Sequence, residues 1–354
     1  MGFSKSFSYL ILDYLSDRQQ FVQVDDKKSV NRLVKFGVPQ GSILGPVLFN
    51  LYVVKMKTAI KNSSSVQYAD DTNLYMHTKV SKLQTCAAAL QTDANGLNEW
   101  ANDSNLLLNA KKTKTILFGT SAMVRRHNLS GEQAYEIMID GKKLTRVDSQ
   151  KILGVQFDSN LIWGDHVSEV TRSCYSTIKT LRHVRRFASL PLRKQLMEML
   201  ILSKMDYCNV VFDSITQQQL KRLERVQRCA AGFALGRYAS NHEILLLGWL
   251  PIKEKIQFSL AKLVYKSLNC EGWPNYLPMT LRVEQHNVRR SNRFDAPTPS
   301  LLVDCNDSVG TFKNNAGTAF NDLPEKCRSS ETFATFCKSA KGYLFDKATA
   351  RFIA

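Results

Sequence analysis

The chain has 354 residues, 44% of them hydrophobic, and a formal net charge of +17. This length predicts two or three domains of ~150 residues. The absence of an apolar run of ~18 residues argues against a membrane span. The first residues also lack the apolar core of a secretory signal. Eight scattered cysteines without a Cys-x-x-Cys pair are typical of reduced thiols, so we expect an intracellular protein, nuclear or cytoplasmic, and the positive charge predicts a polyanionic partner.

The first segment of the chain has the pattern of a helix followed by a hairpin. Phe7, Leu10, Ile11 and Tyr14 recur at helical spacing within the first twenty residues. Alternating runs at 21–24 and 33–36, separated by a polar turn, predict two paired strands.

A glycine-containing loop comes next, with the sequence Gly37-Val38-Pro39-Gln40-Gly41-Ser42. Pro46 then opens an apolar helix at the position where proline is favoured. Glycines allow the backbone to approach a large ligand, and a helix start favours anions. The loop lacks the Lys-Ser/Thr ending of the phosphate-cradling motif, so it indicates a ligand without specifying one.

Two adjacent aspartates, Asp70 and Asp71, lie between two strand-like runs. The alternation of Val66, Tyr68, Leu74 and Met76 predicts that these side chains form the inward faces of two short strands. Two neighbouring carboxylates repel each other, and their commonest use is to bind a hard divalent cation such as Mg²⁺. The alternative is an ordinary acidic turn, because Asp also favours turns.

Further elements follow before the character of the sequence changes. Ser81-Lys82-Leu83-Gln84 has the form of a capping box at the start of a helix that reaches Trp100. A basic turn containing Lys112 precedes a strand at 115–118, Asp140-Gly141 predicts a hairpin turn, and 151–157 has the pattern of a strand.

From Asp165 onward the pattern is helical. We expect helices at 167–187, 191–205, 217–233 and 252–268, then a loop-rich segment from 272 with one helix at 330–345. Between Arg172 and Arg228 the chain carries twelve Lys or Arg and four acids, a net charge of +8. A solvated helix face usually mixes both signs, so nucleic acid is the favoured partner of this block.

The run Gly37 to Tyr52, followed by Tyr68-Ala69-Asp70-Asp71, resembles the reverse transcriptase family, specifically the non-LTR (LINE-like, jockey-type) retrotransposons. The resemblance implies an RNA-directed DNA polymerase that uses two Mg²⁺ ions, or Mn²⁺ in their place. Its partners would be an RNA template, a DNA primer or RNA–DNA hybrid, and deoxynucleoside triphosphates. The implied roles are metal binding and catalysis by Asp70 and Asp71, template and nucleotide contact by Pro39, Gln40, Gly41, Ser42 and Lys112, and a primer grip at Leu153 and Gly154.

The same resemblance implies an α+β fold in three parts. These are a truncated palm at 1–157, in which an antiparallel sheet packs against helices, a basic all-helical thumb-like domain at 158–271, and a loop-rich appendage at 272–354. Within the thumb-like domain, the residues expected to bind nucleic acid are Arg182, Arg185, Arg186, Lys221 and Arg222.

The sequence departs from the family pattern at one point that bears on activity. The family's metal site uses a further aspartate from a strand upstream of the glycine loop, and only 36 residues precede that loop here. We therefore expect the chain by itself to be catalytically incomplete. The alternatives are a non-catalytic nucleic-acid-binding module and a transposon relic that does not fold; a viral RNA-dependent RNA polymerase is disfavoured because Ala69 stands where that group usually has Gly.

Overall fold

The computed structural model describes residues 3–129, 134–274, 277, 279–281, 302–303 and 311–353. The chain divides into two compact units, unit 1 at Met1–Val147 and unit 2 at Asp148–Ala354. Helices mix with small sheets that are mainly antiparallel, which confirms the predicted mixed helix-and-strand class. Among the described residues, no helix combines the length and apolarity needed to cross a bilayer.

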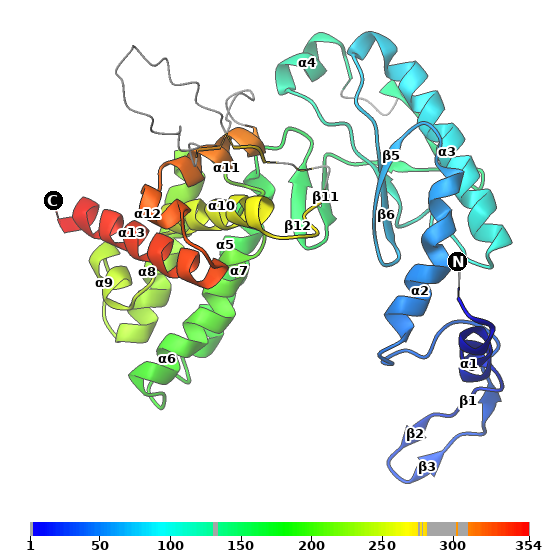
Figure 1. Ribbon diagram of the computed structural model, residues 1–354, viewed down its shortest axis with the longest axis horizontal. Helices are drawn as coiled ribbons and strands as arrows, with labels where there is room; N and C mark the ends of the chain where they lie inside the picture. The colour runs from blue at the N-terminus through cyan, green and yellow to red at the C-terminus, as the bar shows by residue number, and fades with distance from the viewer. Residues whose placement is uncertain are drawn as a thin grey trace, which may run out of the picture. The chain divides into compact units, whose positions relative to one another are not determined.

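Unit 1 consists of helices and strand pairs (Figure 1). Its helical elements are α1 (Lys5–Leu15), α2 (Gly45–Val53), the 3₁₀ turns η1 (Val54–Ala59) and η2 (Val80–Lys82), α3 (Leu83–Asp103) and α4 (Ser121–Arg126). Its strands are β1 (Gln19–Gln20), β2 (Gln23–Val24), β3 (Lys27–Lys28), β4 (Arg32–Leu33), β5 (Ser64–Tyr68), β6 (Asp71–Tyr75), β7 (Lys114–Thr115), β8 (Met138–Ile139), β9 (Lys142–Lys143) and β10 (Thr145–Arg146).

The strands of unit 1 pair two by two. β1 pairs with β4, β2 with β3, β5 with β6 and β8 with β9, all antiparallel, whereas β10 pairs with β7 in parallel. The turn predicted at Asp140-Gly141 is confirmed, because both residues adopt the positive φ that a tight hairpin turn requires, 51° and 68°. The single N-terminal hairpin that we predicted is instead two shorter pairs.

The core of unit 1 is small. Ala87 and Ala94 of α3 pack against Ile137, Ile139 and Leu144 in one cluster. The capping box predicted at Ser81 is wrong, because Ser81 lies within the 3₁₀ turn η2 and the N-cap of α3 is Lys82, without a side-chain cap. The long helix predicted after it is present as α3, which packs against η1 and β8.

Unit 2 begins with one hairpin and continues as helices. The hairpin, β11 (Ser149–Ile152) with β12 (Val155–Asp158), replaces the single strand predicted at 151–157. The helical elements are α5 (Gly164–Leu181), α6 (Leu190–Met197), the π turn η4 (Glu198–Leu202), α7 (Ser203–Asp206), α8 (Gln217–Leu235), α9 (Asn241–Leu246), α10 (Ile252–Asn269), α11 (Phe312–Asn321), α12 (Glu325–Arg328) and α13 (Phe333–Ile353).

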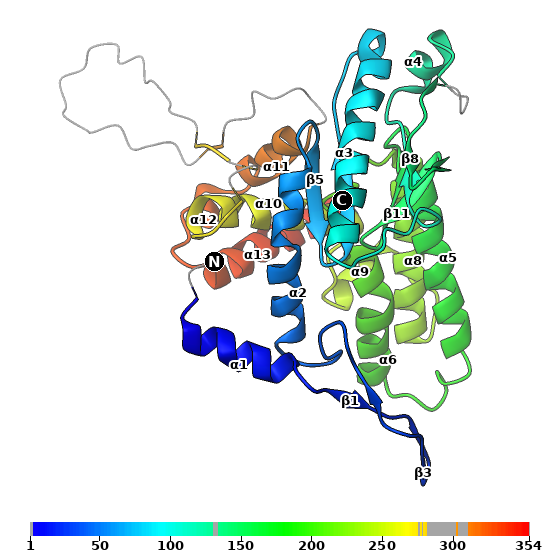
Figure 2. The same cartoon turned by 90° about the vertical axis from the view of Figure 1, so that its right-hand side faces the viewer.

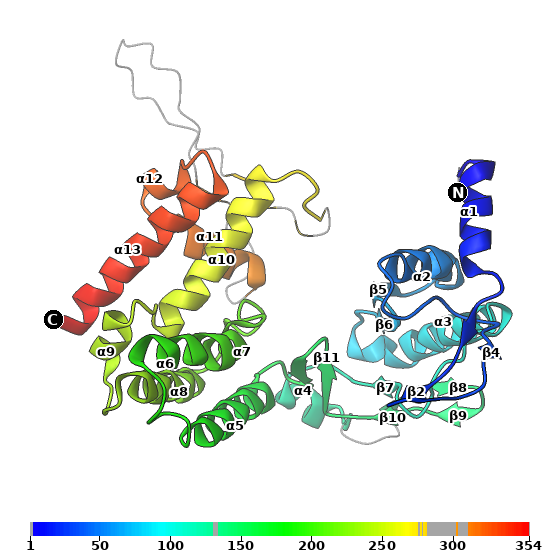
Figure 3. The same ribbon diagram turned by 90° about the horizontal axis from the view of Figure 1, so that it is seen from below.

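One large core holds unit 2 together. Val167 of α5, Val226 of α8, Ala261 of α10 and Leu344 of α13 are all fully buried in it. Helices α5, α6 and α8 lie side by side (Figure 2), and α13 lies alongside α10 (Figure 3). Much of 275–310, within the segment predicted to be loop-rich, lies outside the described residues, and α11–α13 after it contribute side chains to the same core.

Candidate functional site

Asp70 and Asp71 occupy the tip of the β5–β6 hairpin. Tyr68 pairs with Asp71, so Ala69 and Asp70 form a two-residue turn. Ala69 adopts a positive φ of 52°, and its carbonyl oxygen accepts a 3.1 Å hydrogen bond from the side-chain nitrogen of Gln67. Both aspartates are exposed, which leaves their carboxylates open to a ligand.

The predicted inward faces of this hairpin are wrong for β5. Val66 is 51% and Tyr68 67% exposed, whereas Ser65 and Gln67 are half-buried. The register explains the error, because Val66 lies opposite Asn73 while Leu74 lies opposite Ser65, so Val66 and Leu74 belong to opposite faces. Asp71 therefore shares the open face with Tyr68.

Asp93 of α3 fixes the chain just before this hairpin. Its carboxylate is 1% exposed and accepts hydrogen bonds from the backbone nitrogens of Lys61 at 3.0 Å, Asn62 at 3.0 Å and Ser63 at 2.7 Å, and from the Ser63 hydroxyl at 2.7 Å. Burial opposes ionisation of this group, but the hydrogen bonds from 61–63 outweigh it and lower its pKa from 3.8 to about 2. An ionised side chain thus anchors the segment that leads into β5.

Sequence reasoning missed Asp93, although a signal was present. An acidic residue stands three positions after Leu90, on the face of α3 that the apolar spacing assigns to the core. Gly96, one turn further along α3, allows the helix to approach the chain before β5 closely, because a Cβ placed there would lie 2.8 Å from the carbonyl oxygen of Ala59.

Ser42 of the glycine loop hydrogen-bonds to the first residue of α2 and to the loop itself. The Ser42 hydroxyl donates to the carbonyl oxygen of Pro39 at 2.8 Å and accepts from the backbone nitrogen of Gly45 at 3.0 Å. Gln40 and Gly41 are exposed, and Gly41 has a φ of 83° that favours glycine. The loop therefore presents Gln40 and Gly41 to solvent, while Pro39 and Ser42 hold its shape.

Lys112 lies in a turn that Asn109 organises. The backbone nitrogen of Lys112 donates to the backbone and side-chain oxygens of Asn109, at 3.0 and 3.1 Å, and the Lys112 side chain is exposed. Within the described ranges, no hydrogen bond or ion pair connects Lys112, the glycine loop and the hairpin tip. These predicted site residues all lie in unit 1.

Leu153 and Gly154 form the turn of the β11–β12 hairpin in unit 2. Leu153 has a φ of 46° and Gly154 one of 83°. The Tyr207 hydroxyl donates to the carbonyl oxygen of Leu153 at 2.7 Å, and a Cβ on Gly154 would lie 3.1 Å from the Tyr207 ring. The turn is thus held from the end of α7.

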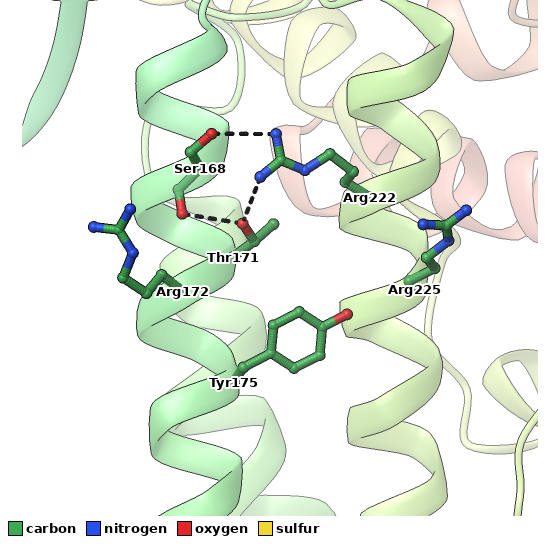
Figure 4. A pocket seen from close by; sticks show the side chains of 6 residues that line it. All are labelled: Ser168, Thr171, Arg172, Tyr175, Arg222 and Arg225. Carbon is green, nitrogen blue, oxygen red and sulfur yellow. Dashed lines mark hydrogen bonds between the residues drawn. The ribbon is translucent and has the colours of Figure 1, made fainter.

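A groove lined by arginines runs between α5 and α8, and we call it the arginine groove. It comprises two adjoining hollows of about 400 and 540 Å³ that share Tyr175 and Arg225. Figure 4 shows the first hollow, with the Tyr175 ring lying between the two helices and the Arg222 guanidinium turned toward α5. The basic and aromatic residues that line the groove are Arg172, Tyr175, Arg182, Arg185, Arg222, Arg225, Arg228, Phe233, Arg237 and Tyr238.

The predicted nucleic-acid-binding residues divide between the groove and its surroundings. Arg182, Arg185 and Arg222 line it, whereas Arg186 and Lys221 are exposed outside the lining, Arg186 lying 4.7 Å from the Phe187 ring centroid. Four further arginines of the groove were not among the predicted binding residues: Arg172, Arg225, Arg228 and Arg237. For the first three the signal was helical spacing, because Arg172 precedes Tyr175 by three residues on α5, and Arg225 and Arg228 continue from Arg222 at every third position on α8.

Positive charge dominates the groove, because none of the described residues that line it is acidic. Arg222 donates to the hydroxyls of Ser168 at 3.1 Å and Thr171 at 3.4 Å, which ties α8 to α5 through neutral partners. Arg237, at the far end, pairs with Glu243 at 3.0 Å. Burial raises the pKa of the Tyr175 hydroxyl, and a hydrogen bond with Cys229 adds to the rise.

Comparison with known proteins places the first part of the chain. Residues 3–157 match the family described as reverse transcriptase (RNA-dependent DNA polymerase). The chain is 27% identical over 180 residues to a probable RNA-directed DNA polymerase from transposon BS of Drosophila melanogaster, and 27% identical over 173 residues to that of the mobile element jockey of the same species. It is 25% identical over 228 residues to the jockey polymerase of Drosophila funebris.

These alignments cover 49%, 47% and 62% of the chain. They span only 19%, 18% and 24% of the respective relatives, about a fifth to a quarter of their length. The family match includes the glycine loop, the aspartate hairpin, Lys112 and the β11–β12 turn. Residues 3–157 are therefore a reverse transcriptase domain, related to the RNA-directed DNA polymerases of non-LTR transposable elements such as jockey.

Proposed function

We propose that the β5–β6 hairpin is the carboxylate-bearing element of a polymerase palm. On this proposal the chain is part of an RNA-directed DNA polymerase that acts on an RNA template, a DNA primer and deoxynucleoside triphosphates. One observation carries it: Asp70 and Asp71 are adjacent, exposed carboxylates at a hairpin tip inside the residues that match the family. A tight turn presents both groups without distorting the strands behind them.

The roles proposed for the other residues follow from their exposure. Gln40 and Gly41 face solvent where a template or nucleotide would lie, and the Lys112 ammonium is free to reach nucleotide phosphates. The Leu153–Gly154 turn, braced by Tyr207, would support the primer strand. The helices of unit 2 would then act as the thumb.

The metal requirement of such an enzyme is met only in part by the described residues. Carboxylate oxygens are suitable ligands for Mg²⁺ or Mn²⁺, and Asp70 and Asp71 supply them. Two-metal nucleotidyl transfer holds two ions ~3.5–4 Å apart with bridging carboxylates, yet the described part of the chain contains no group of three or more His, Cys, Asp or Glu placed to hold an ion. The donors fit in kind but not in number, so we propose that the 354-residue chain alone does not extend a primer.

A primer-extension assay tests this proposal directly. The purified chain is incubated with an RNA template, an annealed DNA primer, deoxynucleoside triphosphates and either Mg²⁺ or Mn²⁺. We expect no extension above the background of the Asp70→Ala variant. Robust extension that Asp70→Ala abolishes would show that the hairpin works without a further carboxylate from the described residues, and would overturn the proposed inactivity while supporting the role of the hairpin.

A second candidate function is nucleic-acid binding without catalysis. The observation that favours it is the arginine groove, whose described lining contains no acidic residue. Such binding depends on phosphate contacts and weakens with salt, and it does not require the aspartate hairpin. Affinity that is unchanged in Asp70→Ala/Asp71→Ala but falls steeply with salt is the expected result.

A further inference from the structure

We propose that the arginine groove is a binding site for single-stranded nucleic acid, with phosphates on its arginines and bases stacked on Tyr175 and Tyr238. The inference rests on the proposed function only in taking nucleic acid as the ligand class. It concerns a different surface from the aspartate hairpin, and its ligand is single-stranded nucleic acid, not a template–primer duplex.

The form of the groove favours a single strand. It consists of two adjoining hollows of about 400 and 540 Å³ between α5 and α8, and the Tyr175 ring lines both. A duplex keeps its bases stacked and paired in its interior, whereas the bases of a single strand can turn outward and stack on aromatic rings. Individual nucleotides of an extended strand can therefore place phosphates and bases along the groove.

The charge of the groove favours phosphate. Among the described residues, no ion pair neutralises Arg172, Arg182, Arg185 or Arg225. Planar guanidinium groups recognise phosphate oxygens through paired hydrogen bonds. These four arginines of the groove thus offer hydrogen-bond donors that no acidic residue of the described protein occupies.

Like charges also converge at one end of the groove. A Cβ on Gly236, the C-cap of α8, would lie 3.1 Å from a guanidinium nitrogen of Arg193 and 3.3 Å from one of Arg185. The Nε of Arg193 is buried without a hydrogen-bond partner in the described structure. Two neighbouring cations repel each other unless an anion lies between them, which marks this end as a place for a phosphate.

Aromatic side chains within the groove supply surfaces for bases. Tyr238 is 86% and Tyr175 42% exposed, and both line the second hollow. Stacking on aromatic rings combined with a positive groove is the usual way in which proteins hold single strands without sequence preference. A site for duplex backbone alone would not need exposed rings among its arginines.

The test uses the full chain and fluorescence anisotropy of a labelled oligouridylate RNA of about 16 nucleotides, the upper site size of one single-strand-binding fold. The groove variant is Arg172→Glu/Arg225→Glu. The control is Lys338→Glu/Lys341→Glu on α13, which makes the same change in net charge at exposed positions. Circular dichroism melts confirm that both variants fold.

We expect the groove variant to bind the RNA at least about tenfold more weakly than the control. The slope of log affinity against log salt should fall by about 1.4, which is ~0.7 for each of two lost phosphate contacts. Equal losses of RNA affinity in the two variants would mean that binding depends on the net charge of the protein and not on the groove, and would overturn the proposal.

Stacking is tested separately at Tyr238. Tyr238→Ala should weaken single-strand binding about tenfold, within the range known for one base–aromatic contact, while Tyr238→Phe should bind as the unmodified chain does. Binding of an RNA–DNA hybrid of the same length as tightly as the single strand, with no effect of Tyr238→Ala, would overturn the single-strand assignment. The groove proposal is judged by RNA affinity and the hairpin proposal by primer extension, so failure of one and failure of the other are distinguishable.

Discussion

The carboxylate of Asp93 accepts 2.7 Å hydrogen bonds from both the backbone nitrogen and the hydroxyl of Ser63, the residue immediately before β5. Asp93→Ala would leave the backbone N–H groups of 61–63 without their acceptor. We expect a loss of about 3 kcal/mol in the free energy of unfolding of unit 1, because charged hydrogen bonds and stranded donors each cost of this order. Hydrogen exchange of the β5–β6 amides measures the effect, and Asp103→Ala on the exposed face of α3 is the control.

The same carboxylate makes the stability of unit 1 depend on pH. The pKa of Asp93 is about 2 in the folded protein against a usual 3.8, so the unfolded chain binds the proton more tightly. The contribution, about 2 kcal/mol, is fully present above pH ~4 and is lost as the pH falls toward 2. Denaturant titrations between pH 5 and pH 2 should show this decline in stability, and the decline should be smaller in Asp93→Asn. An identical pH profile in that variant would show that Asp93 is not its source.

Replacing two helical glycines by alanine should have opposite effects on the stability of the protein. Gly96→Ala places a Cβ 2.8 Å from the Ala59 carbonyl oxygen, whereas Gly342→Ala on α13 meets nothing within 4 Å. Alanine favours a helix over glycine by roughly 1 kcal/mol, so Gly342→Ala should stabilise the protein. Gly96→Ala should destabilise unit 1 despite that gain, and thermal melts of the two variants compare the signs.

The Tyr207–Leu153 contact predicts how the β11–β12 turn is held. Tyr207→Phe removes the 2.7 Å hydrogen bond to the Leu153 carbonyl oxygen and should cost about 1 kcal/mol, seen as faster amide exchange in β11 and β12. Gly154→Ala should cost more than Gly248→Ala. Both glycines have a positive φ, 83° and 73°, but only the Cβ at 154 meets a neighbour, the Tyr207 ring.

An ion pair between a buried carboxylate and a partly exposed arginine joins α10 and α13 in unit 2. Arg351 of α13 donates to both carboxylate oxygens of Glu254 on α10, at 2.9 and 3.2 Å, and Glu254 is 4% exposed. Arg351→Ala leaves that carboxylate buried without its partner and should cost about 3 kcal/mol. The double variant Arg351→Ala/Glu254→Leu should recover part of the loss in urea unfolding; a double variant as unstable as Arg351→Ala would show that the charge is not the cause.

Local patterns predicted some elements of this fold well. Helices expected at 217–233 and 252–268 are found at Gln217–Leu235 and Ile252–Asn269, because an apolar period and terminal signals coincide there. The hairpins at Asp70–Asp71 and Asp140-Gly141 follow from turn chemistry in the same way. Where the pattern was wrong, as for Val66, one position of register decided which face was covered.

The parts that could not be predicted depend on which surfaces meet. Nothing in the spacing of 61–63 indicates that Asp93, thirty residues later, accepts their hydrogen bonds. The arginine groove likewise requires that α5 and α8 pack side by side, which turns separate basic runs into one lining. The sequence therefore predicted the charge of this region and three of its lining arginines, Arg182, Arg185 and Arg222, but not the groove that brings them together.

All sheets in the described ranges have two strands, so each strand has one edge that no further strand covers. Open edges of this kind allow one molecule to add to another, and β5 carries Val66 and Tyr68 in exposed positions beside such an edge. The net charge of +17 keeps copies apart only while salt is low, because added ions screen the repulsion. Raising the salt concentration is thus expected to release the chain from RNA and to drive it into self-association at the same time.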